Sequence, residues 1–492
     1  MQYSVHQLAI FKFAAEGTGN AVVKAVAGSG KTTTLVEAMR QVPATISKIF
    51  LAFNKAIATE LSSRGVNART FHSLTFGPVT KSMGIKTVNQ DKVRDLIDAS
   101  MGEEEARMYG PFVNKLVGLG KNAGIGCLIE DTEQNWNDLA QHHDMELESE
   151  YADYSKALRF ASIILQRSNA SKTALDFDDL LYLAVKNGIP LSKFGFIVVD
   201  EAQDTNAIQR AIIRKIMGQS SRLMAIGDDA QAIYGFRGAD SDSLDLIKSE
   251  FEAIELPLSV TYRCPEAVVA HARQWVSHIE AAPNAPKGTV TSLGCSWKAK
   301  QFKANDLVVC RTTAPVVGLA FTLMLARIPV RIMGKDIGAG MKSLIKRMNA
   351  NSIDNLIQRL EVYTAREVEK ARAKKQDQKM EAIADKTQCI IFLIRSLKEI
   401  KRSVPGLYEV IDQLFSDPRD AVILSTIHKS KGLESDTVYW LNSSKCPAAW
   451  ARQPWQQQQE RNLCYVATTR AKKQLILIED SADNEADGEL KQ

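Results

Sequence analysis

A glycine-rich turn near the start of the chain, AVAGSGKTT (residues 25–33), carries groups that suit phosphate binding. Small residues in such a turn let backbone N–H groups approach a phosphate at the start of a helix. Lys31 adds a positive charge for the β- and γ-phosphates, and Thr32 offers a hydroxyl to Mg²⁺. The stretch fits the pattern G-x-x-x-x-G-K-[ST], except that Ala25 stands at the first glycine position. The candidate nucleotide-binding residues are Ala27, Gly28, Ser29, Gly30, Lys31, Thr32 and Thr33.

Two adjacent carboxylates, Asp200 and Glu201 in IVVDEAQD (residues 197–204), supply the second half of such a site. Asp200 would hold Mg²⁺ through water, and Glu201 would orient and deprotonate an attacking water. The alternative is a pair of helix-capping or solvated carboxylates. Because four apolar residues, 196–199, run directly into the pair, the pattern favours catalysis at the end of a buried strand. Together the two motifs predict a nucleoside triphosphate hydrolase.

A third segment, GDDAQAIYGFRGAD (residues 227–240), combines two kinds of chemistry. Its carboxylates and Gln231 suit phosphate and metal contacts, whereas Tyr234, Phe236 and Arg237 suit stacking against nucleic-acid bases. Because only a few peptide units separate Gln231 from the aromatic residues, a shift at one end would be passed to the other.

The 492-residue chain has the composition of a globular protein, with 45% hydrophobic and 24% charged residues. Its formal net charge of +5 permits nucleic-acid binding without requiring it. The seven cysteines are scattered and include no C-x-x-C pair, which argues against a disulfide framework or a zinc site and favours a reducing compartment. Since we find no signal-peptide pattern and no apolar run of about 18 residues, we expect a cytoplasmic protein of a bacterial or virus-infected cell.

Continuous apolar segments alternate with helical patterns along most of the chain. The segments NAVVKAVA, KIFLAFN, FGFIVV and SRLMAIG have the pattern of strands of one sheet, and DLVVCRT, IPVRIMG, AVILSTIH and TVYWLN have that of a second. This alternation predicts an α/β fold with two parallel sheets covered by helices. The strand before AGSGKTT and the helical pattern after it also argue against a chance Gly/Ser turn.

Helical spacing dominates two further segments, and we interpret each as an insertion into a sheet domain. The acidic end of the chain is either a solvated tail or a docking segment for a protein partner. The predicted division is a first sheet domain of residues 1–79 and 174–259 with a helical insertion at 80–173, a second sheet domain of residues 260–341 and 405–478 with a charged helical insertion at 342–404, and the acidic tail at 479–492.

Eight motifs, in their order along the chain, closely resemble the UvrD/Rep/PcrA family of superfamily 1 DNA helicases. They are AGSGKTT, LAFNKAIATEL, ARTFHSL, VVDEAQD, GDDAQAIYGFRGAD, LSVTYRCPEAV, ILSTIHKSKGLESDTVYWLN and ERNLCYVATTRAKKQL. The resemblance extends from Gln7 to about Ile478, and the last two motifs also resemble the F-box helicase branch of this group. It implies two RecA-like P-loop domains with ATP and Mg²⁺ between them, and only the first domain has a phosphate loop.

The same resemblance implies roles for residues outside the phosphate loop. Arg263 and Arg470 match the family's two arginine fingers, whose guanidinium groups suit the charge of a transferring γ-phosphoryl group. Surface ion pairs are the alternative for both arginines. Four further residues match nucleotide contacts of the family, namely Gln7 for adenine, Tyr262 for the base, Glu434 for the ribose and Gln231 for the γ-phosphate.

Single-stranded DNA binding needs aromatic faces and phosphate contacts, which tolerate any base sequence and are sensitive to salt. A phenylalanine at a strand end would, taken alone, favour a place in the core. Phe236 also departs from the family, which commonly has Trp at that position. By resemblance, the DNA-contacting residues are Phe53, Asn54, Thr70, Phe71, His72, Tyr234, Phe236 and Arg237 in the first domain, and Arg311, Thr313, Thr426, His428 and Lys429 in the second.

The insertion predicted at residues 342–404 is far shorter than its counterparts in UvrD and PcrA. The duplex-binding elements of those large insertions therefore cannot be transferred to this chain. A solvated hairpin, a surface for a protein partner and a reduced duplex grip all stay open as its role.

The resemblance implies an ATP-dependent DNA helicase that moves 3′-to-5′ on single-stranded DNA and unwinds duplexes, as a monomer near the nucleoid, at junctions of single- and double-stranded DNA. A translocase that strips proteins from DNA with little unwinding is the alternative. The intact Glu201, Arg263 and Arg470 argue against a non-motor protein that uses ATP only as a switch. We expect no nuclease activity, because no added domain follows the helicase motifs.

Overall fold

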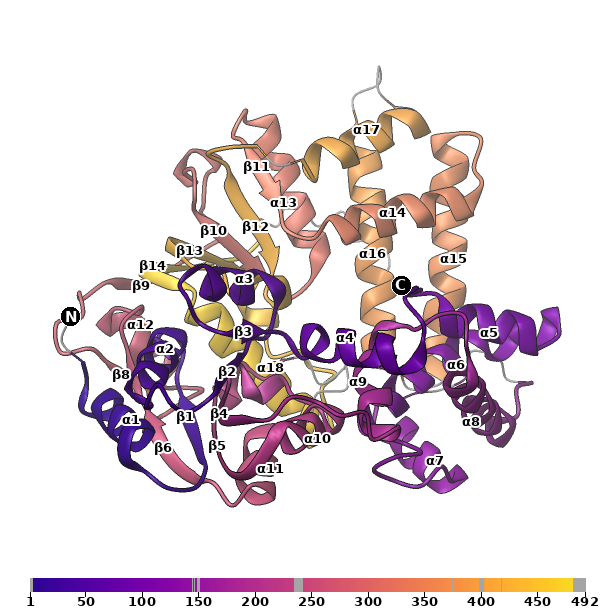
Figure 1. The fold of residues 1–492 in the computed structure, drawn as a ribbon. Helices are drawn as coiled ribbons and strands as arrows, with labels where there is room; N and C mark the ends of the chain where they lie inside the picture. The colour runs from indigo at the N-terminus through magenta and orange to yellow at the C-terminus, as the bar shows by residue number, and fades with distance from the viewer. Residues whose placement is uncertain are drawn as a thin grey trace. The chain divides into compact units, whose positions relative to one another are not determined.

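The computed structural model describes residues 3–143, 145, 147, 151–233, 242–373, 376–397, 402–416 and 418–480. The chain divides into two units, Met1–Ser259 and Val260–Gln492, each built on its own sheet (Figure 1). Tyr234, Phe236 and Arg237, which we predict to stack on DNA, lie outside the described residues, as does most of the acidic tail. Within the described ranges, no helix is both long and apolar enough to cross a membrane.

The first unit contains a six-stranded sheet in the order β3-β2-β4-β5-β1-β6, in which every neighbouring pair is parallel. Successive residues of β4 alternate between two cores, because Phe196 and Val198 belong to one hydrophobic cluster and Ile197 and Val199 to another. A sheet buried on both faces requires strands that are apolar throughout, which explains the continuous apolar runs in the sequence. The strands are β1 (Ala21–Ala25), β2 (Lys48–Leu51), β3 (Ala68–Arg69), β4 (Phe194–Val199), β5 (Met217–Gly227) and β6 (Ile254–Leu258).

Helices cover the two faces of this sheet, and several of them begin at residues that cap them. Ser4 and Gln7 form a capping box at the start of α1, in which each side chain binds a backbone N–H that the helix itself leaves unpaired. The cluster that contains Phe196 is completed by α1 (Val5–Glu16), α2 (Lys31–Gln41) and α3 (Lys55–Ser63). The cluster that contains Ile197 is completed by α4 (Phe71–Met83), α5 (Lys92–Ser100), α6 (Glu103–Ala123), α7 (Glu133–His142), α8 (Tyr154–Ala170), α9 (Phe177–Lys186), α10 (Ala207–Ile216) and α11 (Ser243–Glu250).

A buried ionic network joins three of the helices in the second cluster. Lys92 of α5 lies 2.5 Å from one oxygen of Asp179, and Lys121 of α6 lies 2.7 Å from the other. Lys121 also pairs with Asp176, the residue that caps α9. All four side chains are at least nine-tenths buried, so each charge depends on its partners for stabilisation.

The second unit contains another six-stranded parallel sheet, in the order β11-β12-β10-β13-β14-β9. Its central strands are buried, as Val308, Leu424 and Leu441 show, whereas no residue of the edge strand β9 is buried. The predicted fold class, with two parallel sheets in an α/β protein, is therefore confirmed. The strands of this unit, with the separate pair β7 and β8, are β7 (Val260–Thr261), β8 (Glu280–Ala281), β9 (Thr289–Gly294), β10 (Leu307–Cys310), β11 (Val330–Ile332), β12 (Val422–Thr426), β13 (Ser435–Leu441) and β14 (Ala471–Ile478).

The described chain between β11 and β12 is mainly helical, and we call it the helical segment. Within it α15 packs along α16, and α16 packs on α13, where the rings of Phe321 and Phe392 meet edge to face at 6.2 Å (Figure 1). The helices of the segment are α14 (Lys335–Met348), α15 (Ile353–Ala373), α16 (Asp377–Ser396) and α17 (Val404–Leu414). The other helices of the unit are α12 (Glu266–Ala272), α13 (Thr313–Leu325) and α18 (Pro454–Thr468).

Candidate functional site

The turn between β1 and α2 has the backbone conformation that the glycine-rich sequence predicts. Gly28 and Gly30 both adopt left-handed conformations, with φ of 72° and 78°, and Gly30 is the N-cap of α2. Side chains other than glycine rarely adopt such values, which explains why glycine stands at these two positions. The first N–H groups of α2 have no partner within the helix, so the turn presents donors where a phosphate would bind.

Two contacts join this turn to the carboxylates at the end of β4. The Thr32 hydroxyl donates to Asp200 Oδ2 at 3.0 Å, and Lys31 Nζ lies 3.3 Å from Glu201 Oε1. Thr32 and Asp200 are 168 positions apart in the sequence. The fold therefore brings together the two halves of the site that the sequence predicts.

Burial and charge shift the pKa values of this cluster. Burial, together with the neighbouring Glu201, raises the pKa of Asp200 to about 6. Burial likewise raises the pKa of Asp228. Burial alone would lower the pKa of Lys31, but the charges of Glu201, Asp228 and Asp200 raise it overall. Three carboxylates around one ammonium leave an excess of negative charge, which suits a divalent cation.

Thr32 and Asp200, the two predicted metal ligands, supply oxygen atoms only. Mg²⁺ prefers oxygen ligands and keeps several waters or phosphate oxygens, so a hydroxyl and one carboxylate fit its usual coordination. Among the described residues, no group of three or more His, Cys, Asp or Glu side chains is arranged to hold a metal ion by itself. The pair therefore suits a cation that arrives with phosphate oxygens.

A chain of side-chain hydrogen bonds links Glu201 to Gln231. Gln203 donates to Glu201 Oε2 at 2.5 Å and accepts from the Asp228 backbone N–H at 3.0 Å, and Gln231 donates to Asp228 Oδ2 at 2.6 Å. A Cβ at residue 227 would lie 2.5 Å from Gln203 Oε1, so this set of hydrogen bonds requires glycine at position 227. The sequence motifs gave no role to Gln203 and named Asp228 only among the carboxylates of the segment 227–240, although each is within three residues of a predicted site residue.

Gln7, the predicted adenine contact, lies beside the phosphate turn. Its amide donates to the Thr34 hydroxyl of α2 at 3.0 Å, and the Gln7 side chain is the nearest group to a Cβ built on Gly30. The capping box with Ser4 fixes the same side chain from the other end. Gln7 is therefore held close to α2 by two separate contacts.

Four residues predicted to contact nucleotide lie in the second unit, and three of them meet there. Arg263 Nε donates to Glu434 Oε2 at 2.6 Å, and its Nη1 donates to the Thr469 carbonyl at 3.3 Å. Arg470 is buried and donates to the carbonyls of Val466 and Leu433 at 3.0 and 3.2 Å. Tyr262, directly before Arg263, is 47% exposed. The fold thus gathers Arg263, Glu434 and Arg470 around the end of α18.

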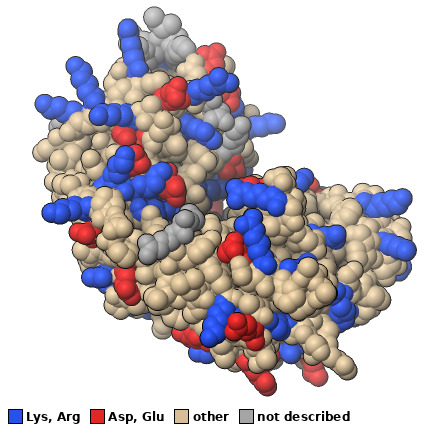
Figure 2. Space-filling view, turned by 60° about the vertical axis from the view of Figure 1, so that its left-hand side comes forward, with Lys and Arg blue, Asp and Glu red and all other residues tan. Residues whose placement is uncertain are grey.

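The predicted DNA contacts of the first unit differ in exposure. Phe53 is 45% exposed, whereas Phe71 is buried. Asn54 and Thr70 are N-caps, of α3 and α4 respectively. The His72 ring meets Phe177 edge to face at 5.9 Å, and burial lowers the pKa of His72. Among the described residues on the face shown in Figure 2, Lys and Arg are interspersed with Asp and Glu.

In the second unit, the predicted DNA contacts lie near carboxylates of the helical segment. Thr426 ends β12, and His428 and Lys429 lie in the short helix η6 (His428–Ser430) that follows. Lys429 Nζ lies 2.9 Å from Asp336 Oδ2. The backbone N–H of Thr313 donates to Asp385 at 2.9 Å. Lys429 and the Thr313 backbone N–H therefore already have acidic partners within the unit.

Arg311, another predicted DNA contact of the second unit, pairs with two carboxylates. Its Nε and Nη2 donate to the Glu460 carboxylate at 2.7–3.0 Å, and its Nη1 lies 3.5 Å from Glu381. Burial would lower the pKa of Arg311, but the hydrogen bonds and charge of Glu460 raise it. Trp450 lies beside the same guanidinium, at 5.7 Å. This geometry supports a structural role for Arg311 in addition to the predicted DNA contact.

Arg311→Lys is expected to lower the free energy of unfolding by about 2 kcal/mol, because lysine cannot make the forked bonds to the buried Glu460. Urea unfolding of the full chain would measure the change. Arg461→Lys, on the exposed face of α18, is the matched control and should change the free energy by less than about 0.5 kcal/mol. Equal stability of the two variants would contradict the structural role.

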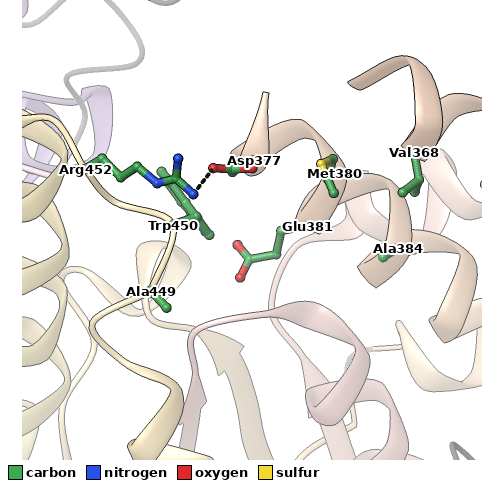
Figure 3. Close-up of a pocket in the computed structure, with 8 residues that line it drawn as sticks. All are labelled: Val368, Asp377, Met380, Glu381, Ala384, Ala449, Trp450 and Arg452. Atoms are coloured by element: carbon green, nitrogen blue, oxygen red, sulfur yellow. Dashed lines mark ion pairs between the residues drawn. The ribbon is translucent and has the colours of Figure 1, made fainter. Parts of the chain in front are cut away.

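A cavity of about 460 Å³ lies next to Arg311, between the helical segment and the residues before α18. Its walls are mostly apolar and include Val368, Met380 and Trp450. Arg452 pairs with Asp377 at its edge at 3.5 Å, and the Glu381 carboxylate is directed into it (Figure 3). Glu381 therefore both lines the cavity and pairs with Arg311.

Comparisons with known proteins agree with the motifs. A model of the UvrD/REP helicase N-terminal domain matches residues 8–252, and one of the UvrD-like helicase C-terminal domain matches residues 340–481. A probable DNA helicase II homolog of Mycoplasma pneumoniae is 26% identical over 58% of this chain and 44% of its own length. The ATP-dependent DNA helicase PcrA of Staphylococcus epidermidis is 28% identical over 36% of this chain and 23% of its own length.

The F-box branch is also represented among the relatives. The F-box DNA helicase 1 of Gallus gallus is 24% identical over 92% of this chain, which corresponds to 47% of that protein. The chain thus spans less than half the length of each of these relatives. Two family models in the expected order, on the two units that carry the predicted motifs, show that the chain belongs to the UvrD/REP family of superfamily 1 helicases.

Proposed function

We propose that this chain is an ATP-dependent DNA helicase that moves 3′-to-5′ on single-stranded DNA. The observation that supports it best is the meeting of Lys31 with Glu201 and of Thr32 with Asp200 at the start of α2. An ammonium, a hydroxyl and two carboxylates in this arrangement suit the binding and hydrolysis of a nucleoside triphosphate. The names of the relatives support DNA as the substrate, and the direction of movement rests on the family resemblance.

In the proposed reaction, the turn 27–30 and Lys31 bind the phosphates, and Thr32 and Asp200 hold Mg²⁺. When bound there, Mg²⁺ would neutralise charge on the phosphate oxygens. Glu201 accepts a proton from the attacking water, and Gln203 orients the Glu201 carboxylate by holding Oε2. We keep for Arg263 and Arg470 the role that the resemblance implies, as contacts of the γ-phosphate.

The predicted division into domains and insertions, and the predicted DNA contacts, are part of the same proposal. Phe53 supports it in the first unit, because its aromatic side chain is 45% exposed just after β2, where a base can stack on it. The predicted insertion at residues 342–404, shorter than its counterparts in UvrD and PcrA, favours a second candidate, a translocase that displaces proteins from single strands with little unwinding.

The test measures ATP hydrolysis with and without single-stranded DNA, and then strand displacement on duplexes with a 3′ or a 5′ tail. We expect DNA to stimulate hydrolysis and 3′-tailed duplexes to be unwound. Hydrolysis that DNA does not stimulate would refute the motor. Unwinding from 5′ tails alone would refute the direction of movement, and stimulated hydrolysis without displacement would favour the second candidate.

A further inference from the structure

Three carboxylates of the helical segment bind polar groups of the second unit at residues that are predicted to contact DNA. They are Asp336 of α14 and Glu381 and Asp385 of α16, and we call them the segment carboxylates. Their partners are Lys429, the Arg311 guanidinium and the first backbone N–H groups of α13. A carboxylate and a DNA phosphate both bind such donors through anionic oxygens.

Asp385 occupies the start of α13 as a phosphate would. Its two oxygens accept from the backbone N–H groups of Thr313 at 2.9 Å and Ala314 at 2.6 Å. The start of a 13-residue helix carries unpaired N–H groups and partial positive charge, so it attracts anions. Glu381 lies one turn earlier on the same helix as Asp385 and faces Arg311 at 3.5 Å. One face of α16 therefore places two carboxylates against two anion-binding groups.

Asp336 differs from these two because its contact is open to solvent. Its oxygens lie 2.9 and 3.1 Å from Lys429 Nζ, and the two side chains are 67% and 37% exposed. Exposed ion pairs contribute little to stability, and a competing anion in solution can replace either partner. The Asp336–Lys429 pair is thus the contact that DNA could exchange without disturbing the fold.

We propose that Asp336 occupies a position that a DNA phosphate takes, so that the helical segment competes with DNA for Lys429 of the second unit. Asp336 is the exchangeable member, and the departure of Asp336 from Lys429 accompanies DNA binding. This inference rests on the proposed function, because it requires Lys429 to be a DNA contact. It gives the short helical segment a role within the chain itself, that of setting how tightly single strands are held.

The test compares Asp336→Asn with Asp412→Asn for the binding of fluorescent oligothymidylate to the full chain. Asp412 is the matched control, because it belongs to another exposed pair of the helical segment, with Lys342. Asp336→Asn should tighten binding about threefold to fivefold at low salt, with a smaller effect at high salt, and Asp412→Asn should not. The DNA concentration that half-saturates ATP hydrolysis should fall by the same factor while the rate without DNA stays unchanged. Asp336→Glu should restore the original affinity.

A double-mutant cycle with Lys429→Ala distinguishes the effect of the Asp336–Lys429 ion pair from that of the change in net charge. Asp336→Asn should no longer tighten binding when Lys429 is absent. Tightening that persists, or equal tightening by Asp412→Asn, would overturn the inference, and so would weaker binding by Asp336→Asn. If Lys429→Ala leaves DNA affinity unchanged, this inference is wrong. The proposed function is unaffected by that result, because it is tested separately by the stimulation of ATP hydrolysis by DNA.

Discussion

Glu201→Gln is expected to reduce ATP turnover by at least about a hundredfold, because glutamine cannot accept the proton of the attacking water. ATP binding should persist and should not weaken, since the substitution frees Lys31 from the carboxylate that now lies 3.3 Å away. Steady-state phosphate release would measure turnover, and titration with a fluorescent ATP analogue would measure binding. The two measurements together distinguish a catalytic defect from a damaged site.

The matched control for this change is Glu255→Gln, at an exposed glutamate of the edge strand β6 in the same unit. Turnover of the control should stay within about twofold of the original chain, as expected of a surface substitution. A Glu201→Gln variant that keeps more than a tenth of the original turnover would contradict the assignment of Glu201 as the general base.

Asp179→Asn is expected to lower the free energy of unfolding of the first unit by about 3–5 kcal/mol, because it leaves Lys92 and Lys121 buried with too little negative charge. Burial would raise the pKa of Asp179, but the two lysines lower it below 3.8 overall. The contribution of ionised Asp179 to the free energy of unfolding is therefore complete above about pH 4 and is lost as the pH falls through the pKa of the folded state. Urea unfolding at pH 7 would measure the loss.

An exposed ion pair of the same unit provides the comparison. Lys156 and Glu105 lie 2.6 Å apart with both side chains 40% exposed, so Glu105→Gln should change the free energy of unfolding far less than Asp179→Asn does. If Asp179→Asn cost no more than Glu105→Gln, the buried network would not stabilise the packing of α5 and α6 on α9.

Sequence patterns predicted the buried strands more readily than the edges of the sheets. Strands such as β4 and β10 are apolar throughout because helices cover both of their faces. The edge strand β9 has the mixed sequence TVTSLG and no buried residue, and β3 has only two residues. Local sequence holds little signal for such strands, since their pairing depends on a neighbour distant in the chain.

The candidate site shows the same division. The glycine turn and the DEAQD segment are local motifs, so the sequence predicted Lys31 and Glu201 before their contact was known. The pairing of Arg311 with Glu460 spans 149 residues, and nothing near Arg311 in the sequence indicates it. The Asp385 cap of α13 likewise comes from another helix, so local capping signals at Thr313 could not reveal it.

The hydrogen-bonded chain from Glu201 through Gln203 and Asp228 to Gln231 has a mechanical consequence. The side-chain amide of Gln203 is engaged at both its nitrogen and its oxygen, so it cannot rotate without breaking a bond to Glu201 or to the Asp228 backbone. Three hydrogen bonds thus connect the Glu201 carboxylate, the proposed general base, to residue 231, so a movement of the one would be passed to the other. Residue 234, the first of the predicted stacking residues, follows three positions later. ATP hydrolysis and DNA binding would then be coupled through this hydrogen-bonded chain, with Gln203 as the residue that connects its two halves.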